Sequence, residues 1–234
     1  MDLYSIILEN KLTLEALYTL AISLICAVIV IKTDRFFRLS LHQGIRYFRN
    51  AFFFYGVAFI ARYVFGLLSD LNFEPVYIAQ MIFEYFIVMA GFFLFYSLIW
   101  KKFESSKQKS FSSLFNVRIL IFHLMAILIA VLDYLWGSYD FMFFSQMIIF
   151  LIACMIAAMN LGKNYGKHKF PKFYLAAMVL SLGAWALNFL AETFFNWDFS
   201  ILIGISVINI LFFLLFLYGV IRITKTKSNG SKET

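Results

Sequence analysis

Seven apolar runs of roughly 20 residues follow one another along this chain, and they constrain its fold more than any other feature. A run of that length crosses a hydrocarbon core about 30 Å thick as an α-helix. The runs lie near residues 12–33, 47–68, 75–99, 118–137, 141–161, 173–194 and 199–221. The sequence therefore predicts an all-α polytopic membrane protein, with a seven-helix transmembrane bundle over residues 1–222 and a flexible tail over 223–234.

Composition agrees with this class of protein. Hydrophobic residues make up 63% of the chain and charged residues only 14%, whereas a soluble domain is roughly a quarter charged. Only two prolines occur, and the apolar runs are long, which favours helices over the short alternating segments of a membrane barrel.

Lysine and arginine predict how the bundle is oriented. They gather in residues 34–46, 100–117 and 162–172 and in the tail after 221, while the alternate loops carry acidic residues. By the positive-inside rule, the N-terminus is expected outside and the C-terminus in the cytoplasm of a multi-pass cell-membrane protein. Contact between this basic face and anionic lipid accounts for the net charge of +7, so no nucleic-acid partner is expected. Residues 34–48 mix aromatic and basic side chains, which predicts a short helix in the inner interface.

Arg62 departs from this charge pattern. It lies 13 residues beyond Arg49, or about 20 Å along a helix axis, and so falls in the outer third of the membrane. Its guanidinium is expected either to extend to the outer interface or to pair with an acid inside the bundle. Glu84 is the preferred partner, because its span is adjacent in sequence and its predicted depth matches.

Other polar side chains form stripes toward the outer ends of their spans, where Asp133 and Glu15 also lie. Two readings stay open: hydrogen bonds between helices that fix packing, or a polar pocket open to the outside. In that pocket, Glu84 binds a cation or carries a proton. The candidates for ligand binding or ion pairing are Arg62, Glu84, Gln80, Tyr77, Gln146, Trp185, Asn188, Glu192 and Asn209.

Known chemistries of seven-span proteins find little support in these residues. The last span has no lysine for a retinal Schiff base, and the three histidines are too few and too scattered for a zinc or haem site. No protease constellation occurs, and the Pro-Gln pairs of seven-span sugar transporters are missing. We therefore expect no catalytic residue, no metal and no cofactor, and we do not expect an enzyme.

The segment LHQGIRYFRNAFFFYGVAFIAR, residues 41–62, resembles one found in uncharacterised small multi-pass membrane proteins of archaea. The resemblance covers about a tenth of the chain and implies no activity. It implies that the start of the second span and Arg62 belong to one unit.

Three functions remain as hypotheses. The first is a sensor or receptor-like module that binds a small ligand, lipid or ion in an outer-half pocket and signals through the basic loops to a separate protein partner. The second is a small transporter or a proton- or ion-coupled carrier. The third is a structural subunit of a membrane complex.

Overall fold

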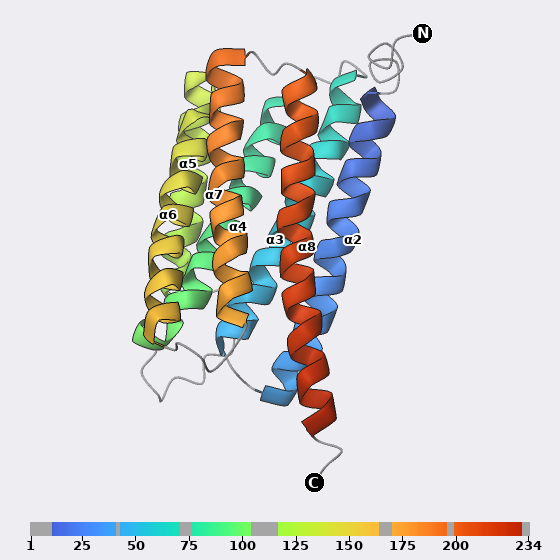
Figure 1. Cartoon of the computed structure of the whole chain (residues 1–234). Coiled ribbons are helices and arrows are strands. Elements are labelled where there is room, and N and C mark those ends of the chain that lie inside the picture. The colour runs from blue at the N-terminus through green and yellow to red at the C-terminus, as the bar shows by residue number, and fades with distance from the viewer. Residues whose placement is uncertain are drawn as a thin grey trace.

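The structure is a computed structural model that describes residues 11–40, 43–70, 76–103, 117–163, 170–195 and 199–230. All of these residues are helical except for a short turn at 137–139. The helices are α2 (Lys11–Ser40), α3 (Gln43–Asp70), α4 (Val76–Phe103), α5 (Val117–Trp136), α6 (Asp140–Lys163), α7 (Phe170–Phe195) and α8 (Phe199–Gly230). They run alongside one another, and the start of α2 and the end of α8 lie at opposite ends of the bundle (Figure 1).

Six of these seven helices are long and apolar enough to cross a membrane, namely α2, α4, α5, α6, α7 and α8. This confirms a multi-pass, all-helical membrane protein. The seventh helix, α3, has 28 residues and carries Arg46, Arg49 and Arg62. It packs directly between α2 and α4, its neighbours in sequence.

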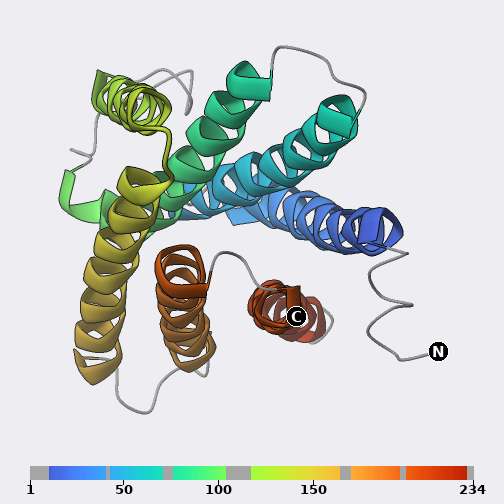
Figure 2. The ribbon, with the colours of Figure 1, turned by 90° about the horizontal axis from the view of Figure 1, so that it is seen from above.

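The helices form a ring with one helix outside it. Each of α2, α3, α4, α6, α7 and α8 contacts the next in that order, and α8 returns to contact α2. Helix α5 packs against α4 and α6 only, within the described part of the chain. The view along the bundle shows this arrangement, with α5 beside the α4–α6 junction (Figure 2).

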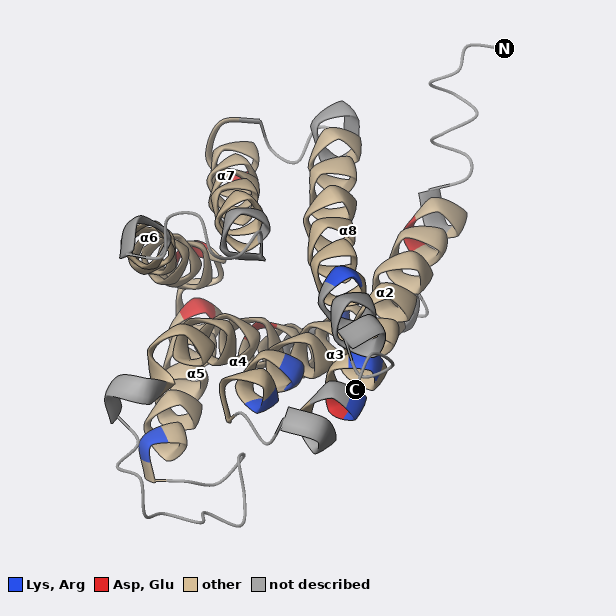
Figure 3. Ribbon diagram, turned by 60° about the horizontal axis from the view of Figure 1, so that its bottom comes forward, with Lys and Arg blue, Asp and Glu red and all other residues tan. Residues whose placement is uncertain are grey.

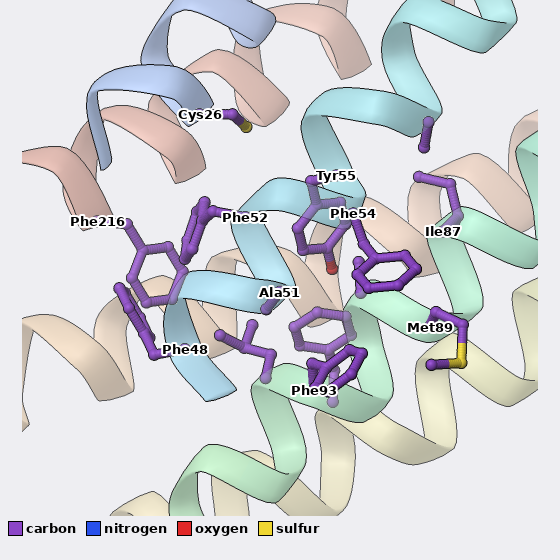
Figure 4. Close-up of a cluster of buried hydrophobic side chains, with 14 of the residues drawn as sticks. Cys26, Phe48, Ala51, Phe52, Phe54, Tyr55, Ile87, Met89, Phe93 and Phe216 are labelled. Atoms are coloured by element: carbon purple, nitrogen blue, oxygen red, sulfur yellow. The ribbon is translucent and has the colours of Figure 1, made fainter. Parts of the chain in front are cut away.

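Aromatic side chains fill the centre of the ring of helices. Phe52 of α3 lies 5.1 Å from Phe216 and 6.1 Å from Phe213 of α8, measured between ring centroids. Phe48 and Tyr55 make similar contacts with these α8 rings, at 5.5 Å each. All five side chains are buried, and Phe48 and Phe52 of α3 lie against Phe216 of α8 (Figure 4). Each such pair contributes about 0.5–1.5 kcal/mol beyond area burial, so the rings hold together helices that lipid alone would not drive into contact.

Two predicted boundaries are wrong. The interfacial helix expected over 34–48 is absent as a separate element, because α2 continues to Ser40 and α3 begins at Gln43. The last span, expected to end at residue 221, continues as helix α8 to Gly230, while the flexibility of the tail over 223–234 stays a prediction. Both segments lack proline, and extending an existing helix is much easier than starting one. Of the predicted loops at 100–117 and 162–172, residues 104–116 and 164–169 lie outside the described residues.

The two ends of the bundle differ in charge, and we call them the acidic end and the basic end. The acidic end holds the start of α2, α4, α6 and α8; the basic end holds the start of α3, α5 and α7. Lys and Arg gather at the basic end (Figure 3). Arg49 forms an ion pair with Asp34 there, which joins α3 to α2. The location of the acidic end outside the cell stays a prediction from the charge pattern.

Candidate functional site

The candidate site lies at the acidic end, beside the turn between α5 and α6. Gly137 adopts a positive φ of 65°, a conformation that glycine reaches without steric cost. The N–H of Ser138 donates to the carbonyl oxygen of Asp133 at 3.2 Å, which closes the last turn of α5. Because the turn is short, the last turn of α5 lies against the first turn of α6.

Asp133 caps the N-terminus of α6. Its Oδ1 accepts the N–H of Phe141 at 2.9 Å, and its Oδ2 accepts the N–H of Met142 at 2.8 Å. The first N–H groups of a helix have no partner within the helix, and a carboxylate is a favoured acceptor for them. The residue at the usual capping position, Tyr139, has no side chain suited to this task. The Asp133 carboxylate is fully buried, and its position is explained by these two bonds.

Glu84 lies beside this cap and is also fully buried. Its Oε1 accepts a hydrogen bond from Nε2 of Gln80 at 2.8 Å, one turn earlier on α4. Its Oε2 meets no donor among the described residues. The Glu84 carboxyl and the Asp133 carboxyl interact with each other. Two fully buried carboxyl groups from different helices therefore lie together at this corner.

Glu192 of α7 reaches the same corner from the other side. Its Oε1 accepts the N–H of Tyr139 at 3.3 Å, while its Oε2 is buried and has no partner in the described residues. Tyr139 lies in the turn, outside the membrane-spanning segments. Burial raises the pKa of its phenol above the ordinary value, and the nearby carboxyl of Glu84 adds to this rise. The phenol therefore stays neutral and keeps its proton.

The expected ion pair between Arg62 and Glu84 is wrong. Arg62 is exposed, and its guanidinium carbon lies 5.6 Å from the centroid of the Phe83 ring. No ion pair joins it to Glu84 in the described residues, where Glu84 instead faces Gln80 and Asp133. The positive charge of Arg62 is thus attracted by an aromatic face instead of a carboxylate of α4.

Other predicted site residues have structural contacts. Asn188 donates to the carbonyl oxygen of Ala184 in its own helix at 2.8 Å. Asn209 donates to the hydroxyl of Tyr18 at 3.1 Å and so joins α8 to α2. The Asn209 bond joins two helices, which is the packing role that was the alternative to ligand binding, whereas the Asn188 bond stays within α7.

Two predicted residues lie deeper, and one cannot be placed. The Gln146 amide is fully buried, has no hydrogen-bond partner among the described residues, and rests against Gly91 of α4. Trp185 packs on Phe143, with 6.0 Å between ring centroids. Tyr77 belongs to the first turn of α4, and its side chain lies outside what the structure describes.

The structure therefore brings together Gln80, Glu84 and Glu192 from the predicted set and adds Asp133. The depth of Asp133 was evident from the sequence, but its role was not. Its signal was the short turn WGSYD that follows it, which forces α5 and α6 into contact. Within the described residues, no group of three His, Cys, Asp or Glu is arranged to hold a metal ion.

No family model, curated protein or solved structure matches this chain. The resemblance of residues 41–62 to archaeal membrane proteins stays a prediction.

Proposed function

We propose that this chain is a membrane-embedded sensor. It binds a small ligand or ion at the acidic end and signals through the basic end to a separate partner. One observation carries this proposal: carboxyl groups from α4, α5 and α7 converge on the start of α6, at one end of a ring whose centre is filled by aromatic side chains. A site at one end of a closed bundle is suited to binding rather than passage.

The chemistry of the site favours a ligand that donates hydrogen bonds or carries positive charge. Two buried oxygens, Oε2 of Glu84 and Oε2 of Glu192, meet no donor in the described residues. An unpaired buried acceptor is costly, and an unpaired buried charge more so. A proton or a small cation supplies what both oxygens lack.

Helix α6 connects the site with the basic end. It has 24 residues, so it is about 36 Å long, and it contacts both α4 and α7. Its N-terminus is held by Asp133 and Glu192, which belong to other helices. A change in either carboxyl therefore alters the position of α6, and a rigid helix carries that change to its other end.

A carrier is the second candidate, and a specific observation favours it. Buried polar atoms that have no hydrogen-bond partner within the described residues also occur deeper in the bundle: the Gln146 amide and the hydroxyls of Tyr55 and Tyr96. Such atoms hold water or a proton transiently if the aromatic centre opens. Transport requires that opening, whereas sensing does not.

The test uses the full chain in proteoliposomes. Spin labels are placed at Ile31→Cys on α2 and Met159→Cys on α6, both exposed positions toward the basic end, with Cys26 and Cys154 replaced by Ala. The distance between labels is measured during steps of pH, Na⁺, K⁺ and a set of small ammonium compounds. Flux of each probe is measured in parallel.

A sensor changes the label distance with at least one probe and shows no flux. Glu192→Gln removes or shifts that response, while Glu15→Gln, an exposed carboxyl on α2, leaves it unchanged. Flux of the active probe indicates the carrier instead. An unchanged distance under every probe, without flux, overturns both functions and favours a structural subunit.

A further inference from the structure

Two fully buried carboxyl groups from separate helices face each other at the acidic end, Glu84 of α4 and Asp133 of α5. Two carboxylates that interact and have no exposed surface cannot both stay ionised, because a like charge close by strongly disfavours the second charge. The pair therefore has to hold a proton, unless a cation lies between them. The described residues place no Lys or Arg in an ion pair with either group.

The hydrogen bonds identify which group carries that proton. Both oxygens of Asp133 accept backbone N–H groups of α6, and the positive end of the helix dipole favours a negative charge there. Asp133 is therefore the ionised member. Glu84 receives one N–H, from Gln80 on Oε1, and its Oε2 receives none. A proton on Oε2 of Glu84 makes this atom a hydrogen-bond donor instead of an acceptor.

The surroundings of the pair contain more negative than positive charge. The titratable or charged groups that interact with Glu84 or Asp133, or lie at the same corner, come from α3, α6, α7 and the α5–α6 turn: Arg62, Asp140, Glu192 and Tyr139. Arg62 is exposed and lies over Phe83, and Tyr139 is a neutral phenol. The remaining carboxyls disfavour a second charge on the pair.

We infer that Glu84 and Asp133 share a single proton, carried by Oε2 of Glu84, and that this proton is the ion to which the acidic end responds. The second half of the inference rests on the proposed sensor function. Loss of the proton places a second negative charge against the group that caps α6. The two side chains then separate, which loosens either the α6 cap or the contact between α4 and α5. A proton is also small enough to reach a side chain with no exposed surface.

Infrared spectroscopy of the full chain in lipid nanodiscs tests for the proton. A protonated carboxyl has a carbonyl stretch distinct from that of a carboxylate or an amide. At neutral pH, we expect such a band, shifted by ¹³C-labelled glutamate and absent from Glu84→Gln. A glutamine at this position accepts from Gln80 and donates to Asp133, so that variant is expected to fold. Glu15→Gln is the matched control and retains the band. A missing band at neutral pH, or a band that persists in Glu84→Gln, overturns the inference.

A second measurement tests the role of the proton. In the doubly labelled protein, an alkaline step that removes the infrared band is expected to change the distance between the labels on α2 and α6. Glu84→Gln is expected to hold the low-pH distance throughout. If the band disappears while the distance stays constant, the proton is structural and its role as stimulus is refuted. The sensor function itself then depends on the Na⁺, K⁺ and ammonium responses, so the two failures are distinguishable.

Discussion

Replacing Asp133 by Ala tests whether a carboxylate from α5 holds the start of α6. The substitution removes the acceptor for two backbone N–H groups, at 2.9 and 2.8 Å. Asp133→Asn retains one acceptor oxygen and turns an amide donor toward the other N–H, so it is expected to lose about half of the effect. Asp140→Asn is the matched control, because Asp140 is in the first turn of α6 without the two bonds.

The size of the effect follows from burial. The bond to Met142 is buried, so its N–H is left without a partner, which costs about 1–3 kcal/mol. The N–H of Phe141 is only partly buried, and water replaces most of what it loses, which leaves about 0.5–1.5 kcal/mol. Loss of both bonds is therefore expected to lower the free energy of unfolding of Asp133→Ala by about 3 kcal/mol. Asp140→Asn loses only a favourable interaction with the helix dipole, about 0.3–1 kcal/mol.

Thermal unfolding in one detergent–lipid mixture measures these differences. For a chain of this length, 1 kcal/mol corresponds to a shift in melting temperature of about 2–4 °C, so Asp133→Ala is expected to melt roughly 6–12 °C below the wild type. Asp133→Asn is expected to fall between Ala and the control. An Asp133→Ala melting temperature within about 2 °C of Asp140→Asn contradicts the capping role, since the two bonds then contribute nothing measurable.

Three further predictions address the rest of the bundle. Gly91→Ala places a Cβ 2.5 Å from Oε1 of the buried Gln146, so it is expected to destabilise by about 1–3 kcal/mol, and adding Gln146→Ala is expected to recover part of the loss in a double-mutant cycle. Arg62→Ala is expected to lower the free energy of unfolding by less than about 1 kcal/mol, because it removes a cation–π contact at an exposed side chain; a loss of about 3 kcal/mol or more indicates a buried ion pair instead. Phe52→Ala is expected to cost about 3–5 kcal/mol in the same assay, because the ring is fully buried among the rings of α8, and a loss below about 1 kcal/mol contradicts a packed aromatic centre.

The spans were predictable because their cause is local. A segment that crosses lipid has to satisfy all of its backbone groups internally, so an apolar run of sufficient length is a helix wherever it lies in the fold. Six of the seven predicted spans qualify on length and apolar character alone. Helix ends in water have no such constraint, which is why α2 and α8 extend beyond the predicted boundaries at residues 33 and 221.

Pairing between helices was less predictable, and Arg62 shows why. Its spacing from Arg49 gives a depth but not the direction of the side chain, since each residue turns a helix by about 100° and packing sets the rotation of the whole helix. Gln80 and Glu84 are four residues apart on one helix, so their contact was visible in the sequence. The contact of Glu84 with Asp133 needs the arrangement of two helices in space.

Asp133 was missed as a site residue for a related reason. Sequence rules for helix starts look for a capping side chain immediately before the first helical residue. That position is Tyr139. The caps come instead from Asp133, in the last turn of α5, and from Glu192 of α7, some fifty residues later in the chain. An aspartate near the end of one helix, followed by a short glycine turn and a helix without a capping residue of its own, is a pattern that predicts such a cap from the preceding helix.

The two acids that cap α6 also limit what the site can bind. Asp133 uses both oxygens on backbone groups, so it has little capacity left for an organic ligand. Glu84 has a free oxygen but no exposed surface, and an ammonium compound reaches it only if α4 and α5 separate. Glu192 is less buried and also has a free oxygen. A proton therefore suits Glu84 and a larger cation suits Glu192. In the proposed sensor, binding at Glu192 and proton release at Glu84 act on the same helix start, so each is expected to change the affinity of the other by the same factor.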